Sequence, residues 1–462
     1  MDLKTLVEGL TDTGYGDEQK LTASGFFKSG SMDELVRYLK KCRCRLMDEM
    51  HESQRRVDRM DYLIRSAEKE AYKEKTGGKR DMNTAWAIIF GGMILAAIAS
   101  IFFLWSRFCK FGIIRKISGD KKWLKRVLGL IPMLVLGIFA WIDTVNTAII
   151  MIHMSICWII VELIALLTRK ICGRKHEEKN GDFGSVDGKF RPYAVGIIVI
   201  IIEVCYFTVG WYLAHNVWET SYTVTTDKEI GKDGLKIAFF ADSHVGALFD
   251  GEGFAEHLQR IQATEPDILL IPGDFVDDDT TKDDMIRCCE ALSGFTCKYG
   301  KYFVYGNHDK GYYQYRNFNS EELRNELEKA GVIILEDEYV LVDDKFYIVG
   351  RQDMSVEDRK NIQGIISDID TSKYMIVLDH QPTDYAAEAA SGVDLVLSGH
   401  THGGQLIEMK LASLLMGAND RTYGTEKREK TDFIVTSGIA DWAIKFKTGT
   451  KSEYCIVNIM GR

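Results

Sequence analysis

The sequence predicts an α/β domain that follows an all-α membrane region of about four helices and an N-terminal helical region. Three observations predict this order. Long apolar stretches fill residues 85–218, and after Gly234 short apolar runs alternate with polar segments of helical pattern. Residues 85–218 carry 15 Lys and Arg against 8 Asp and Glu, whereas residues 219–462 carry 26 against 43. We therefore expect three regions, at 1–84, 85–218 and 225–462.

The strong acidity of the third region makes it a poor candidate for nucleic-acid binding, which needs Lys and Arg against phosphates. The ten cysteines are spread over all three regions, without the density of a disulfide-stapled secreted domain. The Asp and Glu side chains of the third region are therefore candidate metal ligands.

The N-terminal region has one clear helix signal. Residues 1–30 predict a loop with one short helix, and residues 31–34 (Ser-Met-Asp-Glu) match a capping box. The following helix should run to about Thr76, before Gly77-Gly78. Its apolar residues have an approximate three-to-four spacing, which suits either self-association as a coiled coil or packing against residues 1–30.

Four apolar stretches predict membrane spans. The first contains 21 residues without a charge, enough to cross about 30 Å of hydrocarbon, and it lies too far from the N-terminus to be a signal peptide. We therefore expect a multi-pass membrane protein, with spans near residues 85–105, 127–142, 147–168 and 193–215.

Three acids lie in or beside these spans: Asp143, Glu162 and Glu203. A transport role would require a polar pathway, which the sequence does not reveal. The alternatives are a surface turn at Asp143 and pairing of the two glutamates with neighbouring helices.

Positive charge predicts the orientation of the spans. Residues 106–126 hold eight Lys and Arg, residues 169–192 hold seven, and the turn near Asp143 holds none. Basic loops stay in the cytoplasm, so the α/β region should be extracytoplasmic. An even number of spans then places the N-terminal helix outside as well, although six basic side chains precede the first span within 20 residues.

Five predicted strands of the third region each end at a metal-binding type of residue. The carboxyl ends of strands in open α/β folds converge at one edge, where sites form. The strands and the residues that follow them are 235–241 before Asp242-Ser243-His244, 267–272 before Gly273-Asp274, 301–305 before Gly306-Asn307-His308-Asp309, 374–379 before His380, and 393–398 before Gly399-His400-Thr401-His402.

These donors favour two divalent metal ions. Oxygen and nitrogen donors without thiolate suit Mn, Fe, Co or Zn. There are too many for one tetrahedral ion, whereas two ions about 3.5–4 Å apart accommodate them and match in-line attack on phosphorus.

The ordered motifs DSH (242–244), GD (273–274), GNHD (306–309), DH (379–380) and GHTHGGQ (399–405) resemble the calcineurin-like metallophosphoesterases, in their membrane-anchored branch with several spans. The resemblance covers about residues 225–462 and implies a four-layer αββα sandwich. Each motif alone is weak evidence for the family, but the five motifs in this order are specific. Residues 1–84 fall outside the resemblance.

The resemblance also implies the roles of the site residues. Asp274 would bridge two metals, with a hydroxide between them attacking phosphorus, and His308 would protonate the leaving oxygen or stabilise the developing charge. Asp277 would orient His308, or else be a plain surface carboxylate. Gly306, Gly399, Gly403 and Gly404 would form tight turns at the metals. One metal would be held by Asp242, His244, Asp274 and His402, and the second by Asp274, Asn307, His380 and His400.

The resemblance also bears on the class of substrate. Family members that act on phosphoproteins have Arg-Gly where this chain has Asp278-Asp279, which puts a protein-phosphatase role in doubt. The branch includes enzymes similar to those that split UDP-diacylglucosamine, so a lipid-linked phosphodiester or pyrophosphate is expected. Residues 411–416 suit either a bilayer contact or a buried helix, and residues 311–316 either a substrate loop or ordinary loop packing.

A second hypothesis is a membrane sensor or scaffold that uses the fold only to bind a ligand. The full set of ligands together with His308 favours the enzyme, because a binding module needs no acid for a leaving group.

Overall fold

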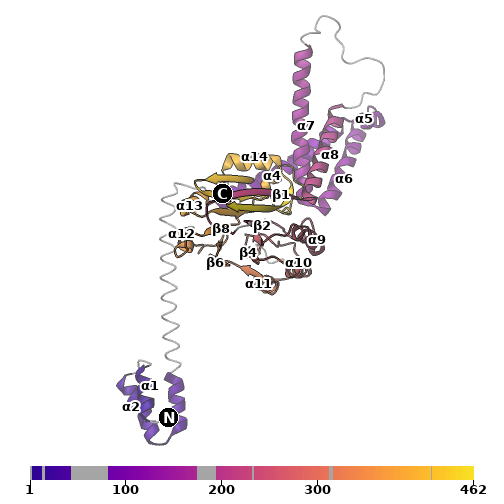
Figure 1. Cartoon of the computed structure of the whole chain (residues 1–462). Helices are drawn as coiled ribbons and strands as arrows, with labels where there is room; N and C mark the ends of the chain where they lie inside the picture. The colour runs from indigo at the N-terminus through magenta and orange to yellow at the C-terminus, as the bar shows by residue number, and fades with distance from the viewer. Residues whose placement is uncertain are drawn as a thin grey trace. The chain divides into compact units, whose positions relative to one another are not determined.

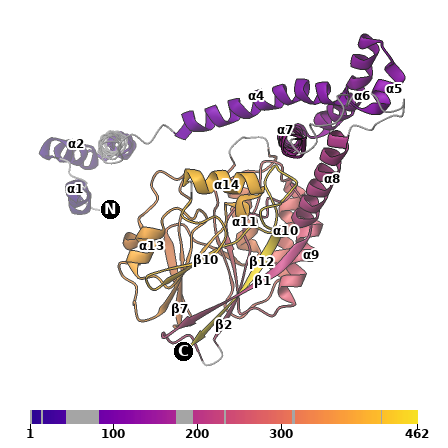
Figure 2. The same cartoon turned by 90° about the horizontal axis from the view of Figure 1, so that it is seen from above.

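A computed structural model of the chain describes residues 3–12, 16–42, 82–173, 194–231, 234–311, 316–417 and 419–461. Figures 1 and 2 show the chain from two directions. The chain divides into two compact units, Met1–Ile94 and Leu95–Arg462.

The first unit contains more helix than the sequence predicted. Helices α1 (Leu3–Asp12) and α2 (Asp17–Lys28) replace the expected loop with one short helix, so that prediction was wrong. The cause is a short apolar stripe in an otherwise polar segment, because Leu6 and Leu10 pack with Ala23 and Leu35. Residues 32–42 continue as a helix, and the rest of the predicted 31–76 helix, with its self-association surface, lies outside the described residues.

Four described helices are long and apolar enough to cross a membrane. A small apolar cluster formed by Leu104, Phe108, Met151, Trp158 and Val199 joins three of them. The short helix α5 (Gly112–Ser118) connects the first two spanning helices, which agrees with the predicted all-α membrane region. The four are α4 (Met82–Phe108), α6 (Lys122–Ile142), α7 (Thr144–Gly173) and α8 (Ala194–His215).

The three acids of this region are paired. Asp143 lies in the turn between α6 and α7, where its carboxylate accepts from Asn146. Glu162 of α7 forms an ion pair with Arg107 of α4 at 2.7 Å. Glu203 of α8 lies 3.0 Å from His153 of α7. The pairing that the sequence allowed is therefore present.

Two six-stranded sheets form the core of the α/β domain. The first has the order β1-β12-β2-β3-β4-β5, and the second has the order β10-β11-β9-β8-β7-β6. Strands β2, β3 and β4 of the first sheet run parallel to one another, as do β8 and β9 of the second, which brings the carboxyl ends of the strands that lead to the motifs to one edge. The strands are β1 (Val217–Thr226), β2 (Leu235–Phe239), β3 (Ile268–Pro272), β4 (Lys301–Val304), β5 (Val332–Ile334), β6 (Glu338–Val342), β7 (Phe346–Gly350), β8 (Tyr374–Leu378), β9 (Leu395–Ser398), β10 (Gly424–Arg428), β11 (Thr431–Val435) and β12 (Ser452–Gly461).

Helices cover both outer faces of the sheet pair. Helices α9 (Gly251–Gln262), α10 (Lys282–Gly294) and α11 (Ser320–Lys329) pack on the first sheet. Helices α12 (Ile362–Ile366) and α13 (Tyr385–Ser391) pack on the second. Apolar side chains of both sheets, including those of Phe239, Phe346 and Leu397, fill the space between them. The domain is thus the predicted four-layer αββα sandwich.

The domain is joined to the membrane helices by hydrogen bonds as well as by the chain. The Asn146 side chain donates to the Ala443 carbonyl at 2.8 Å and accepts from the Lys445 amide at 2.9 Å. The Lys447 amide donates to the Gly210 carbonyl of α8 at 2.9 Å. The beginning of α7 and the end of α8 therefore contact the same loop, 443–447. The limits 1–84, 85–218 and 225–462 of the three regions stay a prediction.

Candidate metal centre

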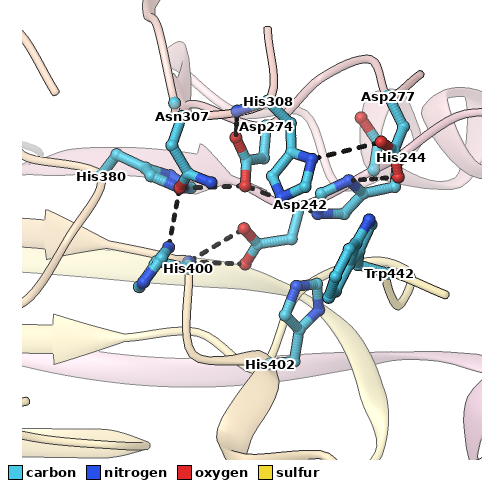
Figure 3. A network of polar contacts seen from close by, with 12 residues as sticks. Asp242, His244, Asp274, Asp277, Asn307, His308, His380, His400, His402 and Trp442 are labelled. Atoms are coloured by element: carbon cyan, nitrogen blue, oxygen red, sulfur yellow. Dashed lines mark hydrogen bonds and ion pairs between the residues drawn. The ribbon is translucent and has the colours of Figure 1, made fainter. Parts of the chain in front are cut away.

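The carboxyl ends of five strands meet at the edge of the sandwich shown in Figure 3. From the first sheet, β2 leads to Asp242 and His244, β3 to Asp274, and β4 to Asn307 and His308. From the second sheet, β8 leads to His380 and β9 leads to His400 and His402. Residues up to 160 positions apart in sequence therefore lie in one site.

The first group of candidate ligands is Asp242, His244 and His402. Each offers a donor atom, and these atoms lie within 4.8 Å of one another. All three residues are buried. The Asp242 carboxylate also accepts from the His400 amide at 2.9 Å, which ties the turn after β2 to the turn after β9.

The second group is Asp274, His380 and His400, whose donor atoms also lie within 4.8 Å. The Asn307 side-chain oxygen joins them, at 3.2 Å from His380 Nε2 and 2.9 Å from His400 Nδ1. His380 Nδ1 lies 2.8 Å from the Pro272 carbonyl, so it carries the ring proton and leaves Nε2 facing the group.

Asp274 lies between the two groups. Its Oδ2 atom is 3.5 Å from His244 Nε2 and 3.1 Å from His380 Nε2. Burial would raise the pKa of this carboxyl, but the imidazoles of His380, His244 and His308 hold it well below its usual range. One carboxylate oxygen thus faces both groups, as expected of a bridging ligand.

The chemistry of these donors fits divalent cations. Among the described residues, neither ring nitrogen of the fully buried His244 makes a well-aligned hydrogen bond, although carboxylate oxygens lie nearby. Buried polar atoms are normally satisfied, and a metal ion satisfies a neutral imidazole nitrogen. No thiolate lies in the groups, which suits a borderline or hard cation.

His308 and Asp277 form a pair beside the first group. His308 Nδ1 lies 3.2 Å from Asp277 Oδ1, so Asp277 is not a plain surface carboxylate. Burial raises the pKa of Asp277, but its contacts with His244 and His308 lower it overall. Burial lowers the pKa of His308, and the Asp277 and Asp274 carboxylates raise it above its usual value. The Trp442 ring lies 5.2 Å from the His308 ring.

The backbone at the site is strained where ligands are placed. Asp242, His244, Asp274, His400 and His402 all have positive φ, which non-glycine residues rarely adopt. Such strain persists only where the surrounding contacts require it, and it concentrates at functional sites.

The glycines behave as the motifs predict. Gly403 and Gly404 have φ of 62° and 80°. A Cβ atom at Gly306 would lie 2.2 Å from Asp274 Oδ1, and one at Gly399 would lie 2.8 Å from Asp242 Oδ2. These positions therefore need glycine because the backbone passes close to the carboxylates.

Asp309 is a positioning residue to which the sequence alone assigned no role. Its buried carboxylate accepts from four backbone amides, those of Gly306, Asp274, Phe275 and Val276, at 2.7–3.1 Å. Burial and the Asp274 carboxylate raise the pKa of Asp309 to about 7, while the amide bonds oppose this rise. Its place in the GNHD motif was the available signal.

A second missed pair supports His402. Asp441 Oδ1 lies 3.4 Å from His402 Nδ1 and 3.0 Å from Lys447 Nζ, and both partners in the Asp441–Lys447 pair are fully buried. Nothing in the local sequence marks these residues, because they lie about 40 positions after the last motif.

The predicted substrate loop is described only at its ends. Arg316 donates to the carbonyls of Asp309, at 2.7 Å, and His308, at 3.4 Å. This contact agrees with the loop-packing interpretation for Arg316. Residues 312–315 lie outside the described residues.

The calcineurin-like phosphoesterase family matches residues 235–404. An uncharacterized metallophosphoesterase of Aquifex aeolicus is 32% identical over 252 residues, which cover 52% of this chain and 91% of the relative. Another uncharacterized metallophosphoesterase, from Campylobacter jejuni, is 29% identical over 277 residues, which cover 58% of this chain and 70% of the relative.

A relative from Danio rerio, named a transmembrane protein with metallophosphoesterase domain, is 25% identical over 288 residues, covering 59% of this chain and 63% of the relative. Together with the four apolar helices, this likeness indicates a membrane protein.

We expect Asp309→Asn to weaken both stability and metal binding. In this variant the NH₂ group of Asn faces buried backbone N–H donors and cannot accept from them. Each buried donor left without a partner lowers stability by about 1–3 kcal/mol. The Asn oxygen can still accept from two of the four amides, so the free energy of unfolding should fall by about 2–6 kcal/mol. Thermal unfolding and metal content by mass spectrometry measure these effects.

The exposed acid Asp368 provides a matched control, and Asp368→Asn should change neither quantity. Wild-type metal content and unfolding midpoint in Asp309→Asn would contradict the positioning role.

Proposed function

Because this chain belongs to the calcineurin-like metallophosphoesterases, we propose that it is a membrane-bound hydrolase that cleaves a phosphodiester or pyrophosphate bond with two divalent metal ions. The observation that carries the proposal is the position of Asp274 Oδ2 between His244 and His380, which belong to two different groups of candidate donors.

The metal ligands are assigned as two sets that share Asp274. When bound, two cations lower the pKa of a water molecule and neutralise charge that develops on the phosphoryl oxygens. The chain's own carboxylates, imidazoles and amide hold these positions before substrate binds, so little reorganisation accompanies the reaction. The first set is Asp242, His244, Asp274 and His402, and the second is Asp274, Asn307, His380 and His400.

His308 is the proposed general acid. Its Nδ1 faces Asp277, so the proton available to a leaving oxygen is on Nε2. Asp277 orients the ring and stabilises the imidazolium form, which is the protonation state that a general acid requires. The Trp442 ring packs against the His308 ring.

A lipid-linked phosphodiester or pyrophosphate, such as a molecule similar to UDP-diacylglucosamine, is the proposed substrate class. The loop that carries Asp441 and Trp442 also contacts α7 and α8, which supports a site close to the membrane. Asp278 and Asp279 add negative charge where a phosphoprotein-binding Arg would stand, which argues against a phosphoprotein substrate.

The α/β domain is proposed to lie outside the cytoplasm. The α6–α7 turn, which carries no Lys or Arg, contacts the domain through Asn146, whereas both basic loops are at the opposite ends of these helices. By the positive-inside rule, this arrangement supports an outer position for the turn and the domain.

The ligand sets predict a specific metal stoichiometry. The wild type should bind about two ions per chain. Asp274→Asn should lower the content of both, because the residue serves both sets, whereas His380→Ala should remove mainly the second ion. Metal analysis after dialysis against Mn, Fe, Co or Zn measures this, and loss of equal amounts in both variants would contradict the bridging assignment.

The loss of activity in the His308→Ala variant should depend on the leaving group of the substrate. A poor alkoxide leaving group needs the acid, so its release should slow by about 10²–10⁴-fold, while a nitrophenolate needs little help and should slow less. Metal content should stay at the wild-type value. Steady-state rates on alkyl and nitrophenyl phosphodiesters test this.

Asp277→Asn should show the same dependence on leaving group with a smaller loss, because His308 remains present. An equal loss on both esters in His308→Ala would indicate a structural role for His308. Metal binding without hydrolysis of any ester by the wild type would favour the sensor or scaffold hypothesis.

Sidedness is tested with the exposed position Glu229, near Gly234. An impermeant maleimide should label Glu229→Cys in intact cells, and Asp120→Cys, in the first basic loop, only after permeabilisation. The unsubstituted chain corrects for its native cysteines. The reverse pattern would overturn the proposed orientation.

A further inference from the structure

Helix α14 (Ile407–Met416) presents an apolar face that no described residue covers. Ile407, Leu411 and Leu414 are 53%, 58% and 61% exposed. Their spacing of four and three residues places them on one side of the helix. The structure thus decides against a buried helix, which was one of the two sequence-based interpretations of residues 411–416.

The same helix is held against the membrane helices by polar contacts. Glu408 accepts a hydrogen bond from the Tyr206 hydroxyl of α8 at 2.9 Å. Its other oxygen lies 3.3 Å from His153 Nε2 of α7. The His153 and Tyr206 rings stack on each other at 4.2 Å. Helix α14 therefore forms a continuous surface with α7 and α8.

These contacts determine the position of α14 along the length of the spanning helices α7 and α8. Tyr206 lies nine residues before the end of α8 at His215, and His153 lies nine residues after the start of α7 at Thr144. Nine residues correspond to about 13 Å of helix. Both partners are thus well inside the spanning segments, on the side from which the α/β domain extends.

The length of α8 places this level within the bilayer. Its 22 residues are about 33 Å long, and hydrocarbon is about 30 Å thick, so the helix needs nearly its whole length to cross. Tyr206 cannot then lie in bulk water, and neither can the helix that contacts it. We propose that α14 lies in the half of the bilayer next to the α/β domain, with Ile407, Leu411 and Leu414 among the acyl chains.

This position brings the metal centre to the membrane surface. Helix α14 begins five residues after His402. Between them, the Gln405 side chain donates to the carbonyls of Trp442 and Ile444. The segment from His402 to α14 and the loop beside His308 are therefore held together. A phosphate at the level of the lipid head groups is the substrate that this arrangement favours, a consequence that rests on the proposed function.

Photocrosslinking tests the position of α14 without requiring activity. The full chain with benzoylphenylalanine at Leu411 is reconstituted in vesicles of phosphatidylcholine and phosphatidylglycerol and irradiated. Leu341 of β6, which is 38% exposed, is the matched control. Figure 1 shows β6 on the side of the α/β domain away from α14.

Mass spectrometry of the tryptic peptides 411–421 and 330–345 gives the result. We expect phospholipid adducts on the first peptide at a yield at least about tenfold higher than on the second. Equal yields would overturn the proposal. Crosslinking of Leu411 to a second copy of the chain instead of lipid would show that another molecule covers this face.

A double variant, Leu411→Glu with Leu414→Glu, tests the consequence for catalysis. Hydrolysis of a phosphodiester embedded in vesicles should fall several-fold, and hydrolysis of a water-soluble diester should stay unchanged. Equal loss on both substrates would contradict the membrane role of α14. Lipid adducts in a protein that hydrolyses neither substrate would leave α14 in the bilayer and refute only the proposed function.

Discussion

The buried carboxylate of Asp274 is the contact on which the site depends. It follows β3 in the first sheet and faces His244 of the same sheet and His380 of the second. An isolated buried carboxylate would be expelled or protonated, so its low pKa requires the surrounding imidazoles or the cations they would bind. Asp309 in turn holds the Asp274 backbone through a buried hydrogen bond. The two sheets pack against each other through apolar side chains, and the contacts of Asp274 with the two histidines link them at one edge as well.

A second link connects this edge to the membrane helices. Asp441 contacts His402 and Lys447, and the Lys447 amide donates to Gly210 of α8. A Cβ atom at Gly210 would lie 2.9 Å from the Thr448 side chain, so the close approach requires glycine there. The support of a proposed metal ligand and the anchoring of the domain to α8 therefore use the same loop.

Local patterns predicted the elements better than their limits or their partners. The strand expected at 301–305 is β4 at Lys301–Val304, and the one expected at 393–398 begins later, at Leu395. Apolar runs mark buried strands clearly, but their ends depend on which amides find partners in the neighbouring strand. The two short helices of residues 3–28 were missed because only a few apolar side chains define their buried face.

The sequence by itself determined which donor side chains the site contains, because the order of Asp, His and Asn residues after apolar runs is a local property. It also determined the four apolar helices, because length and composition decide whether a segment can cross a bilayer. Only the tertiary structure decided that Asp309 holds the Asp274 turn, that Asp441 stands behind His402, and that α14 is exposed beside α7 and α8. These contacts join residues distant in sequence, and whether a side chain is covered depends on what the rest of the chain packs against it.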